Sequence, residues 1–145
     1  MNITKNNFQI STDKSRLQPE VIHDYLCNHS YWAKGIPMET VLKAIENSIT
    51  FGVYDQEKQV GFARVTSDKT TFAYLADVFI LEEYRGQGLS KWLIESILKH
   101  PDLQGLRRWL LVTRDAHGLY TQYGFTPLDA PENIMQIKLE NPYLV

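Results

Sequence analysis

The sequence predicts an α/β fold of the α+β type, with one mixed, mostly antiparallel sheet and helices on both of its faces. Three observations predict this fold. Two early segments carry apolar residues at helical spacing, three strand-like apolar runs follow between polar turns, and a glycine turn joins the last run to a third helical segment. A strand that returns to the same sheet after a crossover helix runs parallel, so one strand pair is expected to be parallel.

The N-terminal part of the chain is expected to contain one strand and two helices. Residues 7–12, NFQIST, form the expected first strand. Residues 17–28 form the first helix, because their apolar side chains recur at helical spacing and Pro19 stands near the start, where a missing N–H does little harm. The second helix begins near Pro37 and repeats the same period.

Three antiparallel strands are expected next, over residues 49–54, 59–66 and 71–81. Polar turns separate these runs, and each run is either apolar throughout or alternates with a period of two. In the second run the residues at both the odd and the even positions are small or apolar, which is typical of a strand that is covered on both faces. The middle of the chain therefore forms an antiparallel meander.

The C-terminal part is expected to alternate helices and strands. A third amphipathic helix covers residues 89–98, and the run LRRWLLVT, residues 106–113, supplies a further buried strand. A short helix over 116–123 follows, and two closing strands over 125–129 and 133–139 end the sheet.

The composition fits one domain spanning residues 1–145. Hydrophobic residues make up 43% and charged residues 22%, which is close to the usual globular balance. The formal charge of −2, without a basic block, gives no indication of nucleic-acid binding. Cys27 is the one cysteine, so an internal disulfide is excluded and a reducing compartment is indicated. Since no segment resembles a signal peptide or a membrane span, a cytoplasmic protein without membrane contact is expected.

Arg85, Gly86 and Gly88 stand between the last strand of the meander and the third helix. At such a junction unpaired N–H groups and the positive end of the helix dipole converge, which favours a phosphate group. The glycines allow close approach, and the guanidinium offers a fork of donors to phosphate oxygens. From the spacing alone, a plain tight turn with a surface arginine fits equally well. Neither the third glycine of a dinucleotide-binding fingerprint nor a GxxxxGK[ST] phosphate loop is present, which argues against NAD and nucleoside triphosphates.

Two motifs of defined spacing occur, RGQGLS at residues 85–90 and AHGLYTQYGF at residues 116–125. They resemble the R/Q-x-x-G-x-G/A signature and the A-x-x-x-Y-x-x-x-G-F segment of the GNAT superfamily of acyl-CoA-dependent N-acetyltransferases. Ser90 stands where the signature has glycine or alanine, and Thr113 stands where the family often has asparagine. The order of elements over residues 7–140 also follows this family, so the resemblance implies a GNAT-like sheet with a splayed parallel strand pair.

The resemblance implies the direct transfer of an acetyl group from acetyl-CoA to a primary amine in a ternary complex, without an acyl-enzyme. The pyrophosphate would lie on the N–H groups of the glycine turn, and the pantetheine would pair with the preceding strand like an added strand. For this, the strand over 106–113 must splay away and leave a slot for the thioester; the alternative is a continuously paired sheet. The residues implied in cofactor binding are Val78, Phe79, Ile80, Arg85, Gly86, Gln87, Gly88, Leu89, Ser90 and Thr113.

Tyr120 is the general acid that the resemblance implies. A phenol with a pKa of about 10 can protonate a departing thiolate whose own pKa is about 8.5. The alternative role for Tyr120 is aromatic packing beneath the final strands, as for Tyr123 and Phe125.

Asp77 interrupts the apolar run YLADVFIL, and an acid in a buried strand has either a fixed partner or a part in the site. Both interpretations stay open for Asp77. Strand alternation predicts that Asp77 lies on one face with Leu75 and Phe79, opposite Val78 and Ile80.

Tyr31 and Trp32 lie in the expected loop between the first two helices, where the resemblance implies a wall of the acceptor site. A hydrophobic lid on the core is the alternative role for both aromatics. The acceptor is open among a metabolite, an antibiotic, a peptide N-terminus and a lysine, that is, a small-molecule or peptide amine. The histidines lack metal-ligand spacing, so no metal is expected. A homodimer is left open, and the rival functions are a non-catalytic acyl-CoA-binding module and a nucleotide-binding regulatory domain.

Overall fold

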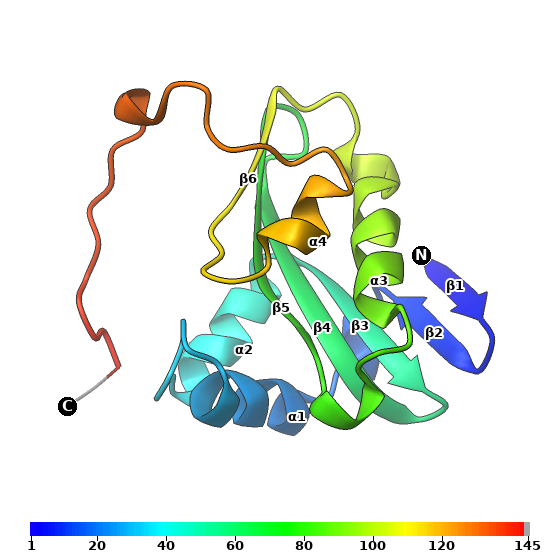
Figure 1. The fold of residues 1–145 in the computed structure, drawn as a ribbon. Helices are drawn as coiled ribbons and strands as arrows, with labels where there is room; N and C mark the ends of the chain where they lie inside the picture. The colour runs from blue at the N-terminus through cyan, green and yellow to red at the C-terminus, as the bar shows by residue number, and fades with distance from the viewer. Residues whose placement is uncertain (144–145) are drawn as a thin grey trace.

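A six-stranded sheet in the order β1-β2-β3-β4-β5-β6 forms the body of the protein (Figure 1). The computed structural model describes residues 1–143. The strands are β1 Asn2–Lys5, β2 Phe8–Ser11, β3 Ile49–Asp55, β4 Lys58–Ser67, β5 Phe72–Ile80 and β6 Arg108–Leu111. The α-helices are α1 Pro19–Asp24, which a π-helical turn Tyr25–His29 continues, α2 Met38–Glu46, α3 Leu89–Leu98 and α4 His117–Thr121.

The strand pairing confirms the predicted fold class. The neighbouring strands from β1 to β5 all pair antiparallel, whereas β5 and β6 pair parallel. The crossover between these two strands contains α3, as the order of elements predicted. The sheet is therefore mixed and mostly antiparallel.

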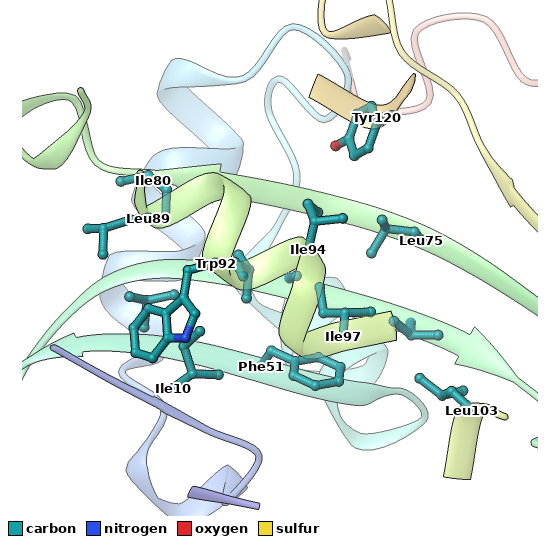
Figure 2. Packing of buried hydrophobic residues seen from close by; sticks show 14 of the residues in the cluster. Ile10, Phe51, Leu75, Ile80, Leu89, Trp92, Ile94, Ile97, Leu103 and Tyr120 are labelled. Carbon is teal, nitrogen blue, oxygen red and sulfur yellow. The ribbon is translucent and has the colours of Figure 1, made fainter. Parts of the chain in front are cut away.

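The sheet separates two clusters of buried side chains. Phe62 and Ala63, neighbours on β4, belong to different clusters, because successive side chains of a strand point to opposite faces. The larger cluster, between the sheet and α3, includes Phe51, Ala63, Leu75, Ile80, Trp92, Leu93, Ile97 and Tyr120 (Figure 2). The smaller cluster, beneath α1 and α2, includes Ile22, Leu26, Val41, Ile45, Phe62 and Phe79. Helices thus cover both faces, and α4 lies on the same face as α3.

The structure differs from the expectations in three places towards the ends of the chain. β1 was not predicted, because Asn2–Lys5 is a polar segment without strand periodicity. The closing strands over 125–129 and 133–139 are absent from the described residues, which run there as exposed, irregular chain. The strand expected over 106–113 is shorter, and β6 is not buried, because no strand of residues 1–143 covers its outer edge.

A β-bulge interrupts β5 at Asp77, whose φ of 56° is left-handed. Arg64 pairs with Ala76 and Phe62 pairs with Phe79, so the bulged strand has two residues opposite the single residue between these partners. The extra residue breaks the predicted alternation: Leu75 belongs to the α3 cluster, not to the face that holds Asp77 and Phe79.

Among the helices of residues 1–143, none combines the length and the apolarity that a bilayer crossing requires.

Candidate active site

One edge of β5 is open along its second half. The parallel pairing with β6 extends only from Phe72 and Arg108 to Leu75 and Leu111. β5 continues to Ile80, whereas the chain leaves the sheet after Leu111. Residues 76–80 therefore have β4 on one side and no strand of residues 1–143 on the other. This is the splayed pair that the family resemblance implied, and its open backbone edge can pair with an extended ligand.

The glycine turn at the end of this edge has a backbone that favours glycine. Gly86 and Gly88 have φ angles of 82° and 81°, in the left-handed region that costs other residues about 1–2 kcal/mol. A Cβ atom on either glycine would meet no atom of the chain within 4 Å. The dihedral angles, rather than lack of space within the chain, therefore explain both glycines, and the second one directly precedes α3.

The N–H groups of residues 86–90 form no hydrogen bond within residues 1–143. They lie at the start of α3, where the helix dipole is positive. A cavity of about 370 Å³ lies beside them. Its lining comprises Ile80, Tyr84, Arg85, Gly86, Gly88, Leu89, Ser90, Lys91 and Leu119. An anion bound in this cavity would meet backbone donors, two basic side chains and one residue of α4.

The guanidinium of Arg85 holds the turn in place. Its Nε donates to the Ile80 carbonyl at 3.0 Å, and its terminal nitrogen donates to the Tyr25 hydroxyl at 2.9 Å. The arginine thereby joins the end of β5 to the helix that follows α1. Since a guanidinium carries further donors, these contacts leave N–H groups for an anion.

Tyr120 lies in the α3 cluster, with 9% of its surface exposed (Figure 2). Its ring packs edge-on against Phe125, at 5.8 Å between ring centroids. Burial first, and the neighbouring Tyr31 and Asp115 next, raise the pKa of the Tyr120 phenol to about 12. The hydroxyl keeps its proton at any ordinary working pH, so Tyr120 packs in the core and also holds a proton.

Asp77 has a partner for each carboxylate oxygen. Oδ2 accepts from Nε of Arg64 at 2.8 Å, and Oδ1 accepts from the indole N–H of Trp32 at 2.8 Å. The side chains of the ion pair are 21% exposed for Arg64 and 11% exposed for Asp77. The bulge that turns Asp77 out of the regular strand thus ties the loop between α1 and α2 to the sheet.

Tyr31 ties the same loop to the segment between β6 and α4. Its hydroxyl accepts from the backbone N–H of Arg114 at 2.8 Å, and the Arg114 guanidinium lies 3.9 Å from the centre of its ring. Trp32 packs edge-on against Tyr31 at 5.1 Å between ring centroids. With 40% and 41% of their surfaces exposed, the two aromatics form a half-exposed wall rather than a buried lid.

Thr113 and Phe79 have structural contacts of their own. The Thr113 hydroxyl accepts from the N–H of Ala116 at 3.0 Å, just before α4. The Phe79 ring stacks on Tyr25 at 4.0 Å between centroids, within the α1 and α2 cluster. The side chain of Phe79 therefore points away from the α3 face, and only its backbone lies on the open edge.

The candidate residues form two groups. The glycine turn and α4 border one cavity at the end of β5, and Asp77, Tyr31 and Trp32 form a linked set at the bulge. Sequence reasoning missed Arg64 and Arg114. The sequence could have indicated Arg64, because it is a lone charge in an apolar strand. Nothing near Arg114 predicted its contact with Tyr31, 83 residues away. Within residues 1–143 no three His, Cys, Asp or Glu side chains gather as metal ligands, and the absence of a metal stays a prediction.

Comparisons with known proteins agree on one family. Residues 46–127 match the family model described as the acetyltransferase (GNAT) domain. A Gibberella zeae protein described as an acetyltransferase is 32% identical over 141 residues, covering 82% of this chain and 78% of its own. The crystal structure of a GNAT-family protein from Xanthomonas campestris is 48% identical, with a TM-score of 0.95 over 98% of this chain and 100% of that chain.

A more distant structure shares the fold alone. It is a GNAT family acetyltransferase from Elizabethkingia anophelis with acetyl-CoA bound, which is 14% identical and has a TM-score of 0.64. The superposition covers 94% of this chain and 91% of that chain.

Proposed function

Because the chain belongs to the GNAT family of acetyltransferases, we propose that it transfers the acetyl group of acetyl-CoA to the nitrogen of a primary amine. One observation carries the proposal. The parallel pair ends at Leu75 and Leu111 while β5 runs on to a turn with unpaired N–H groups. An extended chain that ends in a diphosphate has the shape and the polarity that this edge and turn complement.

In the proposed complex the turn holds the pyrophosphate of acetyl-CoA. The N–H groups of residues 86–90 and the remaining donors of Arg85 would neutralise its charge. The pantetheine amides would pair with the backbone of residues 78–80, and Thr113 would border this arm from the side of β6. No side-chain nucleophile is needed, since the amine itself attacks.

Tyr120 is the proposed general acid. The amine nitrogen attacks the thioester carbonyl carbon, an N–C bond forms and the C–S bond breaks. The departing sulfur takes the proton of the Tyr120 hydroxyl, and solvent returns a proton to the phenolate. The surplus proton of the amine passes to water. The amine is then the nucleophile and the thiol is the leaving group. The thiol proton comes from Tyr120, the phenolate regains one from solvent, and the surplus amine proton goes to water.

The pKa of Tyr120 sets a condition on this step. A phenol with a pKa of about 12 is a weaker acid than an ordinary tyrosine. The surroundings that raise the pKa of Tyr120 by burial would also raise the pKa of a coenzyme A thiol held beside it, because both lose water. The two pKa shifts then have the same direction, so the burial of Tyr120 does not by itself prevent the proton transfer.

The wall formed by Tyr31 and Trp32 is the proposed acceptor end, for a small-molecule or peptide amine. Both carboxylate oxygens of Asp77 are occupied, so we assign Asp77 to positioning the wall and leave amine deprotonation to water. The cytoplasm is the proposed compartment, since the free Cys27 is stable under reducing conditions.

A ligand-induced stability shift followed by an amine screen tests the function. Saturating acetyl-CoA should raise the melting temperature, because a ligand that binds only the folded state stabilises it, whereas NAD and ATP should do much less. Mass spectrometry of amine pools incubated with acetyl-CoA should then reveal an N-acetylated product. Equal shifts with all three ligands would contradict the cofactor assignment, and a selective shift without any product would favour the non-catalytic acyl-CoA-binding module.

A further inference from the structure

Arg114 presents a guanidinium at the proposed acceptor end. Its Cζ lies over the Tyr31 ring, 3.9 Å from the ring centre. An edge-on approach at this distance would press a nitrogen into the ring, so the guanidinium contacts Tyr31 with its face. Its five N–H donors lie in the plane of the group and stay clear of the ring.

The N–H donors of the Arg114 guanidinium form no hydrogen bond within residues 1–143. The nearest carboxylate oxygen of these residues is Oδ2 of Asp115, 4.0 Å from a terminal nitrogen, which is beyond hydrogen-bond distance. The two side chains are 69% and 67% exposed, so this pair contributes little. Stacking on Tyr31 thus fixes the direction of a guanidinium whose donors are available to a ligand.

The other arginine at this end is already occupied. Nε of Arg64 donates to Asp77 at 2.8 Å. A terminal nitrogen of Arg64 donates to the hydroxyls of Ser48 and Thr66. The Asp77 carboxylate neutralises the charge of Arg64, whose side chain is 21% exposed. Arg114, not Arg64, can therefore offer a positive charge to a bound molecule.

Arg114 also lies close to the proposed reaction centre. Tyr31 and Asp115 are the residues whose charges act on the Tyr120 phenol. Arg114 contacts Tyr31 through its backbone N–H and its guanidinium, and it directly precedes Asp115. Thr113, on its other side in the chain, would border the pantetheine arm. An anion bound to Arg114 would therefore lie near the thioester end of the cofactor.

We propose that the acceptor is a small primary amine that carries a carboxylate or a phosphate, and that Arg114 binds this anionic group. The inference rests on the proposed acetyl transfer and names the substrate class of that site. Carboxylate and phosphate each accept two parallel N–H bonds from one guanidinium, which is the geometry that the free edge offers. An acceptor with a second positive charge is disfavoured, because the Arg114 guanidinium covers the face of Tyr31 and repels cations.

Five amines with the same short spacer test this preference. β-Alanine and O-phosphoethanolamine carry the anion, β-alaninamide and ethanolamine are their counterparts without it, and ethylenediamine carries a second cation. With saturating acetyl-CoA, kcat/KM should be at least about 10-fold higher for each anionic amine than for its counterpart, because charge-assisted hydrogen bonds are the strong ones. The ratio between the two anionic amines shows whether the site takes a carboxylate or a phosphate.

Binding is measured separately from turnover. The indole N–H of Trp32 donates to Asp77, and its ring packs against Tyr31, so its NMR resonance should shift when a ligand binds at the wall. Titration of each amine, with and without coenzyme A, gives a Kd. This Kd should be at least about 10-fold lower for the anionic amines than for their counterparts.

Two variants assign the preference to Arg114. Arg114→Gln should bring both ratios to within about threefold of unity, mainly through KM, and Arg114→Lys should keep part of the preference because it retains the charge without the fork. The backbone N–H that bonds to Tyr31 is present in both variants. Arg107→Gln is the matched control, since it makes the same change of charge at an exposed residue just before β6, and it should behave as the wild type.

The possible results separate this inference from the proposed function. Equal kcat/KM and equal Kd for anionic and neutral amines would overturn the inference. Tighter binding of ethylenediamine, or an anion preference that persists in Arg114→Gln, would overturn it as well. Anion-selective binding without any acetylated product would support the assignment of Arg114 and count against the proposed acetyl transfer.

Discussion

In the proposed function, Tyr120 and Gly88 serve the site in different ways. Tyr120 is the proposed general acid, and burial keeps its proton in place with a pKa of about 12. Gly88 contributes a backbone conformation, with a φ of 81° immediately before α3. A substitution at the first residue should change the rate of reaction, whereas a substitution at the second should change affinity and stability.

Tyr120→Phe should lower kcat by about 10²–10⁴-fold and leave the affinity for acetyl-CoA unchanged, because it removes only the proton of a general acid. Steady-state kinetics with an acceptor from the amine screen, together with calorimetric titration of acetyl-CoA, measure the two effects. Tyr123→Phe is the matched control, since it removes a nearby hydroxyl. A wild-type kcat in Tyr120→Phe would make water the proton source.

The pH dependence of kcat gives a second test of Tyr120. Its raised pKa means that the phenol loses its proton only as the pH approaches about 12. The kcat of the wild type should therefore show no decline from this group below about pH 10. A loss of kcat centred between pH 8 and 10 that disappears in Tyr120→Phe would show that the phenol ionises as an ordinary or more acidic tyrosine.

Gly88→Ala should lower the free energy of unfolding by about 1–2 kcal/mol, because alanine is strained at a left-handed φ. It should also weaken acetyl-CoA binding, since relief of the strain would turn N–H groups of the turn away from the ligand. Urea unfolding and calorimetry measure both. Gly118→Ala is the matched control: Gly118 lies inside α4 with open space around it, and alanine there should stabilise by about 0.5–1 kcal/mol.

At the scale of elements, the bulge in β5 links the sheet to the loop between α1 and α2. Asp77 joins Arg64 on β4 to Trp32 in the loop, and Tyr31 joins the loop to the segment before α4. Three separate elements thereby take up fixed positions around the proposed acceptor end. A change in this link should affect amine binding more than cofactor binding.

Asp77→Asn should lower the free energy of unfolding by about 1.5–3 kcal/mol, because it replaces a charge-assisted hydrogen bond to a mostly buried arginine. The KM for the amine should rise, while the affinity for acetyl-CoA should stay constant. Glu95→Gln, in the exposed pair with Lys99, is the matched control and should leave both stability and kinetics unchanged. An equal rise of both KM values would contradict the assignment of Asp77 to the acceptor end.

The elements between residues 49 and 98 could be predicted because each carries its own periodicity. The bulge could not, since an alternating run gives no sign that one residue is surplus to the pairing. The closing strands were predicted for a sound local reason, because 133–139 has a strand pattern. A pattern specifies which side chains share a face, but a strand also needs an edge to pair with, and the local sequence does not show whether such an edge is available.

At the scale of the whole molecule, the free energy of unfolding should fall on both the acidic and the alkaline side of neutral pH. Burial lowers the pKa of His100 below its usual 6.5, so the folded state favours neutral His100 and loses stability as the pH falls below about 6.5. Burial raises the pKa of Tyr54 and of Tyr120 from 10 to about 12. Since the unfolded phenols ionise first, stability should be lost as the pH rises from about 10 towards 12.

Urea unfolding across the pH range measures this profile. The free energy of unfolding should be nearly constant between about pH 7 and 10, where neither group changes its charge. His100→Asn should remove the decline near pH 6 and leave the alkaline decline in place. A decline near pH 6 that persists in this variant would assign it to another group.

The resemblance to the acetyltransferase family located the glycine turn and Tyr120, because both lie in contiguous motifs. The contacts of Arg64 and Arg114 join residues distant in the sequence, and only the folded chain brings them together. The same limit applies to Arg85, which was assigned to an anion from its position but also bonds to Tyr25, 60 residues away. Local motifs thus identified one half of the candidate site, and tertiary structure was needed for the other.

Asp77 is the one residue of β5 that the strand pairing does not need. With Ala76 opposite Arg64 and Phe79 opposite Phe62, Val78 alone would complete a regular register. Deletion of a residue inside a strand normally reverses every face beyond it. Deletion of the Asp77 codon would instead close the strand with all remaining side chains on their present faces. The gene could therefore gain or lose the bend, together with its carboxylate, in a single three-nucleotide event that leaves the sheet intact.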